Sequence, residues 1–493
     1  MQVADLLTAL PSPTLVGPPD REVTGLAYHS LSVAPGDLFA ALRGRAEDGH
    51  RFAADAVRRG AAALLVDHPL PDLAVPQIVV PDTRQALAAL AAAFYGHPSA
   101  SLWVCGVTGT NGKTTTVCLI DAILFRAGLP SAMVGTLGVQ VRGAPVEFHA
   151  TTPTTPEAPD LQRILHNLRQ AGCSHVVMEV TSHALELARV EQCRFRGAVF
   201  TNLTQDHLDF HGDLARYRDA KSRLFAMLDP GGMSVINADD PSGHAMSARS
   251  RAPVWTYGMD PSARVRGEDL RSSPRGTRFT VVWPGGRTPV ELSLPGRFNV
   301  SNALAAFTVG LSLGIDPGVI REALEGVRGV PGRFEMVDEG QDFVVIVDYA
   351  HTPDSLEKVV RLAAEINNGR RLVVFGCGGD RDRTKRPLMG RIATQLADYA
   401  IFTSDNPRSE DPAAIIREIE AGTSGARNYE SQPDRRRAIE RVIALAQPGD
   451  VVVIAGKGHE TYQILRDGVI DFDDRQVARE VLRRRLSTAG EPA

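Results

Sequence analysis

The stretch "GVTGTNGKTTT", Gly106 to Thr116, constrains the fold of this chain more than any other. It follows the apolar run "LWVC" and precedes "VCLIDAILFRAG", which has the composition of a helix that ends at glycine. Glycines allow a tight loop whose backbone N–H groups face one anion, and the following helix adds its positive N-terminal end. A strand, a glycine-rich loop and a helix in this order predict a phosphate-binding loop in an α/β fold.

The loop departs by one residue from the general phosphate-loop pattern. That pattern, GxxxxGK[ST], would need glycine at position 107, where this chain has Val107. Lys113 is nevertheless placed to reach the outer phosphates, and the Thr114 hydroxyl is placed to bind Mg²⁺. The alternative is a glycine-rich loop before a helix with an exposed lysine, but strand, loop, Lys, Thr and helix all agree on a nucleotide site. The predicted nucleotide contacts are Gly109, Thr110, Asn111, Gly112, Lys113, Thr114 and Thr115.

Composition and charge argue against several classes of protein. The chain has 493 residues, which predicts two to four domains, and 43% of them are hydrophobic, which argues against wholesale disorder. A formal net charge of −4 argues against a nucleic-acid partner held by bulk positive charge. The five cysteines form no CxxC pair, as is typical of a reducing cytoplasm. The N-terminus has no signal-peptide pattern and no uncharged apolar stretch reaches spanning length, so we expect a cytoplasmic protein without membrane insertion.

Apolar runs and loop breaks divide the chain into three predicted domains. In the first, "GDLFAAL" and "AAALLVD" are expected to be strands and "TRQALAALAAAFYG" a helix. After the break "GHPSAS", alternating apolar and helical stretches predict a parallel sheet covered by helices, with "RFTVVWPGG" and "PVELSLPG" as a small hairpin insertion. After "VRGVPGRFE" the alternation returns and predicts a doubly wound domain with ligand groups at the carboxyl ends of its strands. The predicted domains are residues 1–98, 99–330 and 331–493.

The phosphate loop by itself does not distinguish a motor, a switch, a kinase and a ligase, but further motifs do. In chain order they are "TTPTTPE" (151–157), "MEVTSHAL" (178–185), "TNLTQDHLDFHG" (201–212), "YRDAKSRLF" (217–225), "GRFNVSNALAA" (296–306), "VDYAHTPDSL" (347–356), "GGDRDRTKRP" (378–387), "SDNPRSEDP" (404–412) and "AGKGHETYQ" (455–463). With "TGTNGKTT", they resemble the motifs of the Mur ligases, in the family's order and over nearly the whole chain. The resemblance implies three α/β domains: a smaller N-terminal domain for the UDP-sugar, a central P-loop ATPase-like domain with a parallel sheet, and a Rossmann-like C-terminal domain for the amino acid.

The family's chemistry implies where the phosphate goes. A carboxylate resists attack by an amine because oxide is a poor leaving group. ATP therefore transfers its γ-phosphoryl group to the carboxylate, and the amine displaces phosphate from the acyl phosphate. Cations must balance the charge on ATP, carboxylate and intermediate together. The resemblance implies two Mg²⁺ ions, or Mn²⁺, held by Thr114, Glu179, His207 and Lys221, and it implies catalytic roles for Lys113, His207 and Lys221.

The roles of two of these residues are inferred only from the motifs in which they stand. Taken alone, His207 in "TQDHLDF" would be an ordinary histidine, and Lys221 in "RYRDAKSRL" would be a solvated helix residue. Their counterparts in the family are a metal ligand and a lysine that CO₂ carbamylates. Carbamylation needs the neutral amine, which burial or nearby cations would favour. The anionic carbamate would then help to hold the second metal ion.

The resemblance also implies contacts for the rest of ATP. The side-chain amides of Asn299 and Asn302 would face the adenine, although helix capping near "RFNVSN" is a competing explanation. Arg333 and Asp348, from the third predicted domain, would reach the phosphates and the ribose. Contributions from two domains imply closure over ATP before chemistry.

The second substrate of the implied reaction is UDP-N-acetylmuramoyl-L-alanyl-D-glutamate, which would lie against the first two domains. The expected contacts are Ser30 for the uridine diphosphate and, for the muramoyl peptide, Thr154, Thr155, Thr181 and Arg189. Thr181 stands where the family more often has serine, and it keeps the hydroxyl. Leu187 stands where some members have glutamine, so one polar contact of the family is in doubt here.

The motif "DNPR" resembles members that add meso-2,6-diaminopimelate, which is lysine with a second amino-acid head. The guanidinium of Arg408 suits its extra carboxylate through a two-pronged hydrogen bond. Such a bond contributes about 1.5–3 kcal/mol, or roughly a ten- to hundredfold preference, so L-lysine and L-ornithine stay open. The alternative that Arg408 only forms an ion pair with Glu410 or Asp411 also stays open. The predicted amino-acid contacts are Arg381, Asp405, Asn406, Pro407, Arg408, Gly456 and Glu460, the last facing the distal ammonium.

Three other functions are weighed against this one. A folylpolyglutamate synthetase or another amino-acid-adding Mur ligase is the nearest, and "DNPR" with "GKGHE" argues against it. A P-loop nucleotide switch or remodelling ATPase would need neither "TTPTTPE" nor the third-domain pocket. An inactive relative is disfavoured because Lys113, Glu179, His207 and Lys221 are all present. We therefore predict an ATP-dependent, amide-bond-forming ligase of peptidoglycan precursor synthesis, which acts as a monomer on small-molecule substrates.

Overall fold

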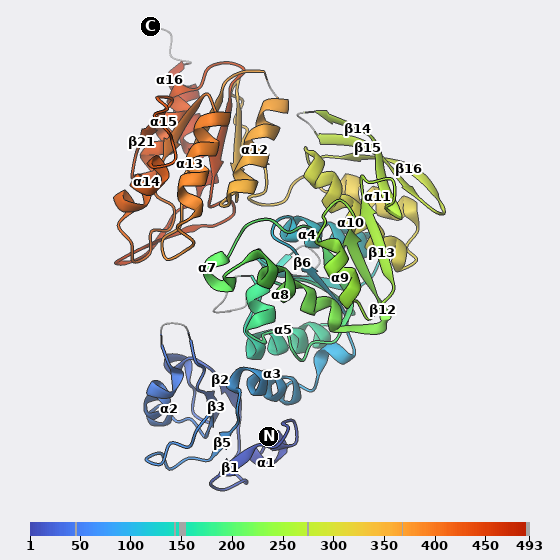
Figure 1. The fold of residues 1–493 in the computed structure, drawn as a ribbon, viewed down its shortest axis with the longest axis vertical. Coiled ribbons are helices and arrows are strands. Elements are labelled where there is room, and N and C mark those ends of the chain that lie inside the picture. The colour runs from blue at the N-terminus through green and yellow to red at the C-terminus, as the bar shows by residue number, and fades with distance from the viewer. Residues whose placement is uncertain (45–46, 142–143, 147–153, 274–275, 367, 490–493) are drawn as a thin grey trace.

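The computed structural model describes residues 1–44, 47–141, 144–146, 154–273, 276–366 and 368–489. Its strands form three large sheets and one two-stranded hairpin. Figure 1 shows the three sheets in succession along the longest axis, with the N-terminal part at the bottom and the C-terminal part at the top. Their strands come from residues 14–79, 103–292 and 335–455. The domain limits at 98/99 and 330/331 stay predictions, and residues 151–153 of the motif "TTPTTPE" lie outside the described residues.

The N-terminal sheet has five strands in the order β1-β5-β4-β3-β2, all parallel except β1. Its apolar side chains pack against α3, whose N-cap Asp82 accepts hydrogen bonds from two backbone N–H groups. The two predicted strands and the predicted helix of this part are confirmed. The elements are β1 (Thr14–Val16), β2 (Gly25–Ala27), β3 (Asp37–Ala40), β4 (Ala63–Val66), β5 (Gln77–Val79), α1 (Val3–Leu7), α2 (Ala53–Arg58), α3 (Thr83–Phe94), and the short 3-10 helices η1 (Ser30–Ser32), η2 (Gly49–Phe52) and η3 (Pro98–Ala100).

The central sheet has eleven strands in the order β16-β15-β14-β13-β12-β11-β6-β10-β7-β8-β9. Its strands are β6 (Trp103–Thr108), β7 (Ser131–Gly135), β8 (Gly138–Val141), β9 (Ala144–Val146), β10 (His175–Glu179), β11 (Phe195–Phe200), β12 (Leu228–Asn237), β13 (Val254–Gly258), β14 (Val265–Ser273), β15 (Gly276–Trp283) and β16 (Gly286–Leu292). The parallel strands β10, β6 and β11 lie side by side, so their carboxyl ends share one edge of the sheet. That edge is where the phosphate loop begins.

Helices cover both faces of the central sheet, which explains why its parallel strands are apolar on both sides. Residues of α4 and α10 belong to one hydrophobic cluster, and residues of α5 and α8 belong to another. The helices are α4 (Lys113–Arg126), α5 (Ala158–Gln170), α6 (Ser182–Glu186), α7 (Leu208–His211), α8 (Leu214–Ala226), α9 (Gly243–Arg249), α10 (Arg297–Ser312) and α11 (Pro317–Gly326). The parallel sheet covered by helices is confirmed.

The predicted hairpin insertion needs a correction. β15 and β16 do pair as an antiparallel hairpin, but β14 pairs with β15 as well and joins β13 in parallel through Val265 and Arg266. The three strands therefore extend the edge of the central sheet. The sequence of β14, "VRGEDLRSS", has no apolar run, since its outer half is solvent-exposed and needs few apolar side chains.

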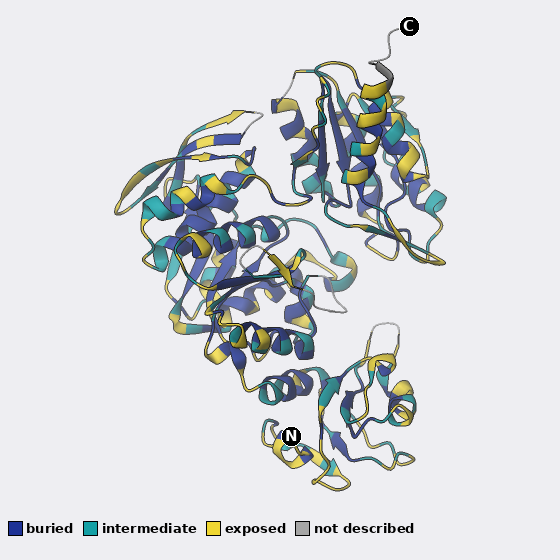
Figure 2. Ribbon diagram, turned by 180° about the vertical axis from the view of Figure 1, so that it is seen from behind, coloured by how far each residue is buried: buried dark blue, intermediate teal, exposed yellow. Residues whose placement is uncertain are grey.

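The C-terminal sheet has six strands in the order β17-β18-β22-β19-β20-β21, all parallel except β17. Helices α12, α13 and α14 pack on one face and α15 and α16 on the other, as predicted for a doubly wound domain. Figure 2 shows the buried strands between these helix layers. The elements are β17 (Glu335–Met336), β18 (Val344–Asp348), β19 (Arg371–Phe375), β20 (Tyr399–Phe402), β21 (Tyr429–Ser431), β22 (Val451–Ala455), α12 (Pro353–Ile366), α13 (Lys385–Leu396), α14 (Pro412–Glu420), α15 (Arg435–Leu445), α16 (Asp474–Ala489), and the hairpin β23 (Tyr462–Leu465) and β24 (Gly468–Asp471).

All five cysteines are free thiols, and four of them are buried in the central and C-terminal sheets or beside them. Burial raises the pKa of the Cys105, Cys193 and Cys377 thiols to about 12. Among the described helices, each is either too short or too polar to cross a membrane.

Candidate active site

The phosphate loop lies between β6 and α4, as predicted. Gly109 has φ of +151° and Gly112 has φ of +83°, and side chains are disfavoured at such values. A Cβ atom at Gly112 would collide with Oδ1 of Asn302, and one at Gly109 would collide with the hydroxyl of Thr201. The glycines are therefore needed both for the turn and for close packing against α10 and the segment after β11.

The segment that follows β11 holds the loop in place. The backbone N–H of Thr110 donates to the carbonyl of Asn202 at 2.8 Å, and that of Asn111 donates to Asn202 Oδ1 at 3.0 Å. The Thr201 hydroxyl donates to the Asn111 carbonyl at 2.7 Å. Asn202 was not among the predicted site residues, although it lies in the motif "TNLTQDHLDFHG" and close behind the buried strand β11.

Two lysines converge on the carbonyl of Gly109. Lys113 Nζ donates to it at 3.0 Å and to the Thr110 carbonyl at 2.9 Å, and Lys221 Nζ donates to it at 2.9 Å. Lys221 is 1% exposed and lies over the ring of Tyr217. Burial and, after it, the charge of Lys113 bring the pKa of Lys221 well below its usual value. Lys221 is thus a buried amine next to the phosphate loop, and the solvated-helix alternative is wrong.

Thr114 and Glu179 meet beside the loop. The Thr114 hydroxyl donates to Glu179 Oε1 at 3.0 Å, and the same oxygen accepts the backbone N–H of Thr136 at 2.8 Å. Glu179 ends β10 and is 1% exposed. Arg333, which precedes the C-terminal sheet, donates through Nη2 to the Thr114 hydroxyl at 2.9 Å. Nowhere in the described residues does a cationic side chain form an ion pair with Glu179.

His207 is the N-cap residue of α7 and has φ of +53°. Its Nε2 lies 3.2 Å from Oδ2 of Asp206, and its ring packs edge-on against that of His183. Burial outweighs the attraction of Asp206 and lowers the pKa of His207 to about 3, so the ring is a neutral imidazole. His207 and Lys221 both contact the ring of Tyr217. Within the described residues, no hydrogen bond joins His207 directly to Thr114 or Glu179.

Of the residues predicted for the rest of ATP, Asn299 and Asn302 are buried, and Arg333 and Asp348 are half-buried. Asn299 Nδ2 donates to the Pro295 carbonyl at 2.8 Å, and Asn302 accepts through Oδ1 from the Thr116 hydroxyl at 3.3 Å. The N-cap of α10 is Gly296 and no side chain caps this helix, so helix capping does not explain the two asparagines. Asp348 ends β18 and accepts the backbone N–H of Phe334 at 2.6 Å, and burial raises its pKa.

Three of the residues predicted for the UDP-sugar peptide lie together. The Thr155 hydroxyl donates to the Thr181 hydroxyl at 3.3 Å, and Arg189 Nη1 donates to the Thr155 carbonyl at 3.1 Å. Arg189 also pairs with Glu157 at 2.9 Å. The Thr154 hydroxyl lies 3.3 Å from that of Thr136. The structure thus brings Thr155, Thr181 and Arg189 together. None of them forms a hydrogen bond with Ser30 among the described residues, and Ser30 is buried in η1 of the N-terminal part.

The residues predicted for the amino acid gather at the carboxyl ends of β20 and β22. Asp405, Asn406, Pro407 and Arg408 follow β20, and Gly456 follows β22 with φ of +118°. A Cβ at Gly456 would lie 2.6 Å from Oδ2 of Asp405.

Arg408 donates through Nη1 to the Gly379 carbonyl at 2.8 Å. Glu410, which sequence analysis weighed as its partner, instead pairs with Arg386 at 2.8 Å, and Asp411 caps α14. In the described part of the chain Arg408 therefore has backbone partners and no carboxylate. Arg381 donates to the Asp380 carbonyl, and burial and the nearby Arg408 lower its pKa.

Glu460 does not stand alone in this pocket. Its Oε2 accepts from Asn406 Nδ2 at 2.8 Å and from Lys457 Nζ at 2.9 Å. Lys457 is completely buried, and sequence analysis quoted its motif "GKGHE" without assigning it a role. The carboxylate expected to face an incoming ammonium thus already has a cation of the protein beside it.

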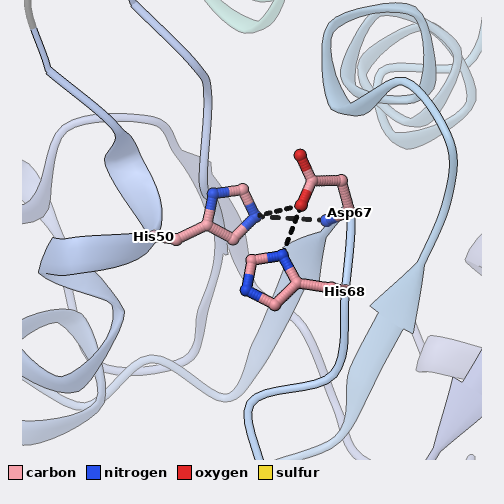
Figure 3. Close-up of side chains that lie close together, drawn as sticks. All are labelled: His50, Asp67 and His68. Carbon is pink, nitrogen blue, oxygen red and sulfur yellow. Dashed lines mark hydrogen bonds and ion pairs between the residues drawn. The ribbon is translucent and has the colours of Figure 1, made fainter.

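A second cluster of titratable side chains lies in the N-terminal part. Figure 3 shows His50 and His68 next to each other with both rings directed at the Asp67 carboxylate, and the ligand atoms are close enough for one metal ion. The two ring nitrogens of His50 are already used in hydrogen bonds, however. The Asp67 N–H donates to His50 Nε2 at 3.1 Å, and His50 Nδ1 donates to Asp48 at 2.6 Å. Arg43 neutralises Asp67 at 2.6 Å. The cluster joins η2 to the end of β4, and its contacts fit a structural role.

Comparison with known protein families agrees with this fold. Three descriptions match the chain: "Mur ligase family, catalytic domain" over residues 22–95, "Mur ligase middle domain" over 107–310, and "Mur ligase, glutamate ligase domain" over 332–458. The chain belongs to the Mur ligase family.

Individual relatives are similar over the full length. The UDP-N-acetylmuramoyl-L-alanyl-D-glutamate--2,6-diaminopimelate ligase of Syntrophomonas wolfei is 48% identical, over 99% of this chain and 100% of the relative. The ligase of the same name from Geobacillus thermodenitrificans is 47% identical, over 98% and 100%. A solved structure of a ligase of this name is 34% identical, with a TM-score of 0.67 over 99% of this chain and 100% of that one.

Proposed function

We propose that the protein is an ATP-dependent ligase that joins meso-2,6-diaminopimelate to the D-glutamate carboxylate of UDP-N-acetylmuramoyl-L-alanyl-D-glutamate. The full-length similarity to ligases of that name supports this reaction. The observation that carries the proposal is the convergence of Lys113, Lys221, Arg333 and the Thr114–Glu179 pair on one phosphate loop. Such a cluster of cations fits the transfer of a phosphoryl group to an anionic acceptor.

The protein's own groups would supply charge balance and position. Lys113 and the loop N–H groups would bind the outer phosphates of ATP, and Arg333 would reach them from the C-terminal part. Asn299, Asn302 and Asp348 would hold the rest of the nucleotide. The D-glutamate carboxylate attacks the γ-phosphorus to form an acyl phosphate and ADP, and the amine of the third substrate then displaces phosphate.

The residues beside the loop fit a divalent cation. The Thr114 hydroxyl and the Glu179 carboxylate are hard oxygen ligands only 3.0 Å apart, and the carboxylate is buried without a protein counter-ion in the described residues. When bound, Mg²⁺ or Mn²⁺ would neutralise phosphate oxygens. His207, as a neutral imidazole, and a modified Lys221 would serve a second ion.

Lys221 is the residue that we propose carries a CO₂-derived carbamate. The amine must lose its proton before it attacks CO₂, and burial beside Lys113 favours the neutral form. A carbamate would replace a positive charge next to Lys113 by a negative one, which favours metal binding there.

The muramoyl-peptide end would lie against Thr154, Thr155, Thr181 and Arg189, with Ser30 at the uridine diphosphate. The amino acid would lie among Arg381, the segment Asp405–Arg408, Gly456 and Glu460. Arg408 has no carboxylate partner among the described residues, which supports the choice of diaminopimelate over L-lysine or L-ornithine.

Phosphate release tests the reaction directly. Purified protein with ATP, Mg²⁺ and UDP-N-acetylmuramoyl-L-alanyl-D-glutamate would be assayed with diaminopimelate, L-lysine or L-ornithine, in the presence of bicarbonate. We expect release mainly with diaminopimelate. Release mainly with lysine or ornithine would leave the ligase and refute the choice of amino acid. No amino-acid-dependent release from folded protein would refute the function. A monomeric state and a cytoplasmic location stay predictions, testable by light scattering and cell fractionation.

A further inference from the structure

Lys457 contacts two of the residues that are predicted to bind the amino acid. It stands in the turn after β22, between Gly456 and Gly458, which both have positive φ. Its side chain is completely buried. Its ammonium donates to Glu460 Oε2 at 2.9 Å and to Asn406 Oδ1 at 3.2 Å. A buried lysine is costly unless its charge is paired, and here both partners are expected to touch the substrate.

The contacts of Lys457 fix the orientation of the Asn406 amide. Asn406 Oδ1 accepts from Lys457 and from the backbone N–H of Ile464 at 2.9 Å. Both of these are donors, so the oxygen must face them, and the amide nitrogen must face Glu460 Oε2 at 2.8 Å. Lys457 therefore positions two pocket residues at once.

Lys457 also sets the charge of the pocket. Arg381 and Arg408 donate to backbone carbonyls and, in the described residues, form no ion pair with a carboxylate. With Lys457 they make three cations, against the two carboxylates of Asp405 and Glu460. The nearby Arg435 is neutralised by Asp474 at 2.7 Å. Counted over these five side chains, the predicted site has one net positive charge, and the count would be zero without Lys457.

We propose that Lys457 is a positioning residue that selects against amino acids whose far end carries only an ammonium group. The proposal rests on the proposed function. L-Lysine bears one net positive charge and is repelled by a cationic pocket, whereas diaminopimelate has a second carboxylate and no net charge. Lys457 acts through its charge: it repels a far end that carries only an ammonium group and attracts the second carboxylate of diaminopimelate.

The test compares discrimination between two amino acids in four proteins. The ratio of kcat/KM for diaminopimelate to kcat/KM for L-lysine is measured for the wild type, Lys457→Met, Glu460→Gln and the double variant. Arg466→Met removes a positive charge from the exposed turn between β23 and β24 and serves as the control. Melting temperature and circular dichroism verify that each variant is folded.

We expect Lys457→Met to lower the ratio about tenfold or more, chiefly through a lower KM for lysine. The double variant should have a ratio lower than that of Glu460→Gln by a similar factor, because the charge of Lys457 acts on the substrate whether or not Glu460 is charged. Arg466→Met should leave the ratio unchanged.

Two results would overturn the proposal: equal losses with both amino acids in Lys457→Met, or an unchanged ratio between Glu460→Gln and the double variant. The second comparison decides the matter even if Lys457→Met does not fold, since the double variant leaves no unpaired buried charge. Wild-type turnover with diaminopimelate is the separate test of the proposed function.

Discussion

At the scale of single residues, the candidate site is made of side chains whose burial changes their chemistry. Lys113 and Lys221 share the carbonyl of Gly109, and burial lowers the pKa of both. Glu179 is buried against a hydroxyl and a backbone N–H, and among the described residues it forms no ion pair. These pairings mark the positions where a substrate or an ion would complete the balance of charge.

The role proposed for Lys221 predicts a dependence on CO₂. Turnover in buffer freed of CO₂ should fall severalfold, and added bicarbonate should restore it, because only the carbamate supplies the missing anion. Lys221→Met should reduce turnover by at least about a hundredfold, whatever the bicarbonate concentration. The measurement is phosphate release at fixed pH. Equal wild-type rates with and without CO₂ would contradict the carbamate.

The role proposed for Arg408 predicts a loss of discrimination. Arg408→Met should lower kcat/KM for diaminopimelate roughly ten- to hundredfold and leave that for L-lysine within a few fold, since only diaminopimelate has the second carboxylate. Arg417→Met, which removes an exposed arginine from α14, is the matched control. A uniform loss with both amino acids would show that Arg408 supports the fold of the loop and does not read the substrate.

At the scale of elements, the sequence predicts the helices, strands and loops whose formation depends on the local pattern of residues. The phosphate loop, β10, β11 and α8 follow from apolar runs, glycine spacing and helical periodicity, and the structure has them. The polar strand β14 carries no such signal, and its pairing with β13 depends on contacts distant in sequence. For the same reason the partners of Glu460 and Asn202 could not be foreseen, because they depend on how separate loops meet in space.

The turn into α4 predicts an effect specific to one glycine. Gly112→Ala should raise the KM for ATP by about tenfold or more, because a methyl group there meets both a positive φ and the amide of Asn302. Gly128→Ala, at the other end of the same helix, also has positive φ but no atom within 4 Å, so it should cost stability and leave the KM unchanged. Steady-state kinetics and thermal melts separate the two effects.

At the scale of the whole molecule, hydrogen bonds join the parts around the three sheets. The hydroxyl of Tyr28 donates to Asp160 at 2.5 Å between the N-terminal and central parts. Asn111 in the phosphate loop donates to Asp354 on α12 at 2.7 Å. The phosphate loop is thus held partly from the C-terminal part of the chain, which couples the relative position of the parts to the nucleotide.

Asp354 therefore has a predicted effect on ATP although it is assigned no contact with it. Asp354→Ala should lower kcat/KM for ATP about tenfold, through loss of a charge-assisted hydrogen bond to the loop. Glu357→Ala on the same helix, which removes only an exposed pair with Arg361, should have little effect. An unchanged kcat/KM in Asp354→Ala would mean that the contact does not persist during turnover.

The alkylation rates of the buried free cysteines can report how often the structure around each of them opens. A thiol reacts as the thiolate, so a buried thiol whose pKa is raised to about 12 is inert until the structure around it opens. Cys105 lies in β6 under the phosphate loop and Cys377 lies beyond β19. Alkylation of each, followed by mass spectrometry, would report the opening rates of the central and C-terminal parts separately. A nucleotide that stabilises the loop should slow the alkylation of Cys105 more than that of Cys377.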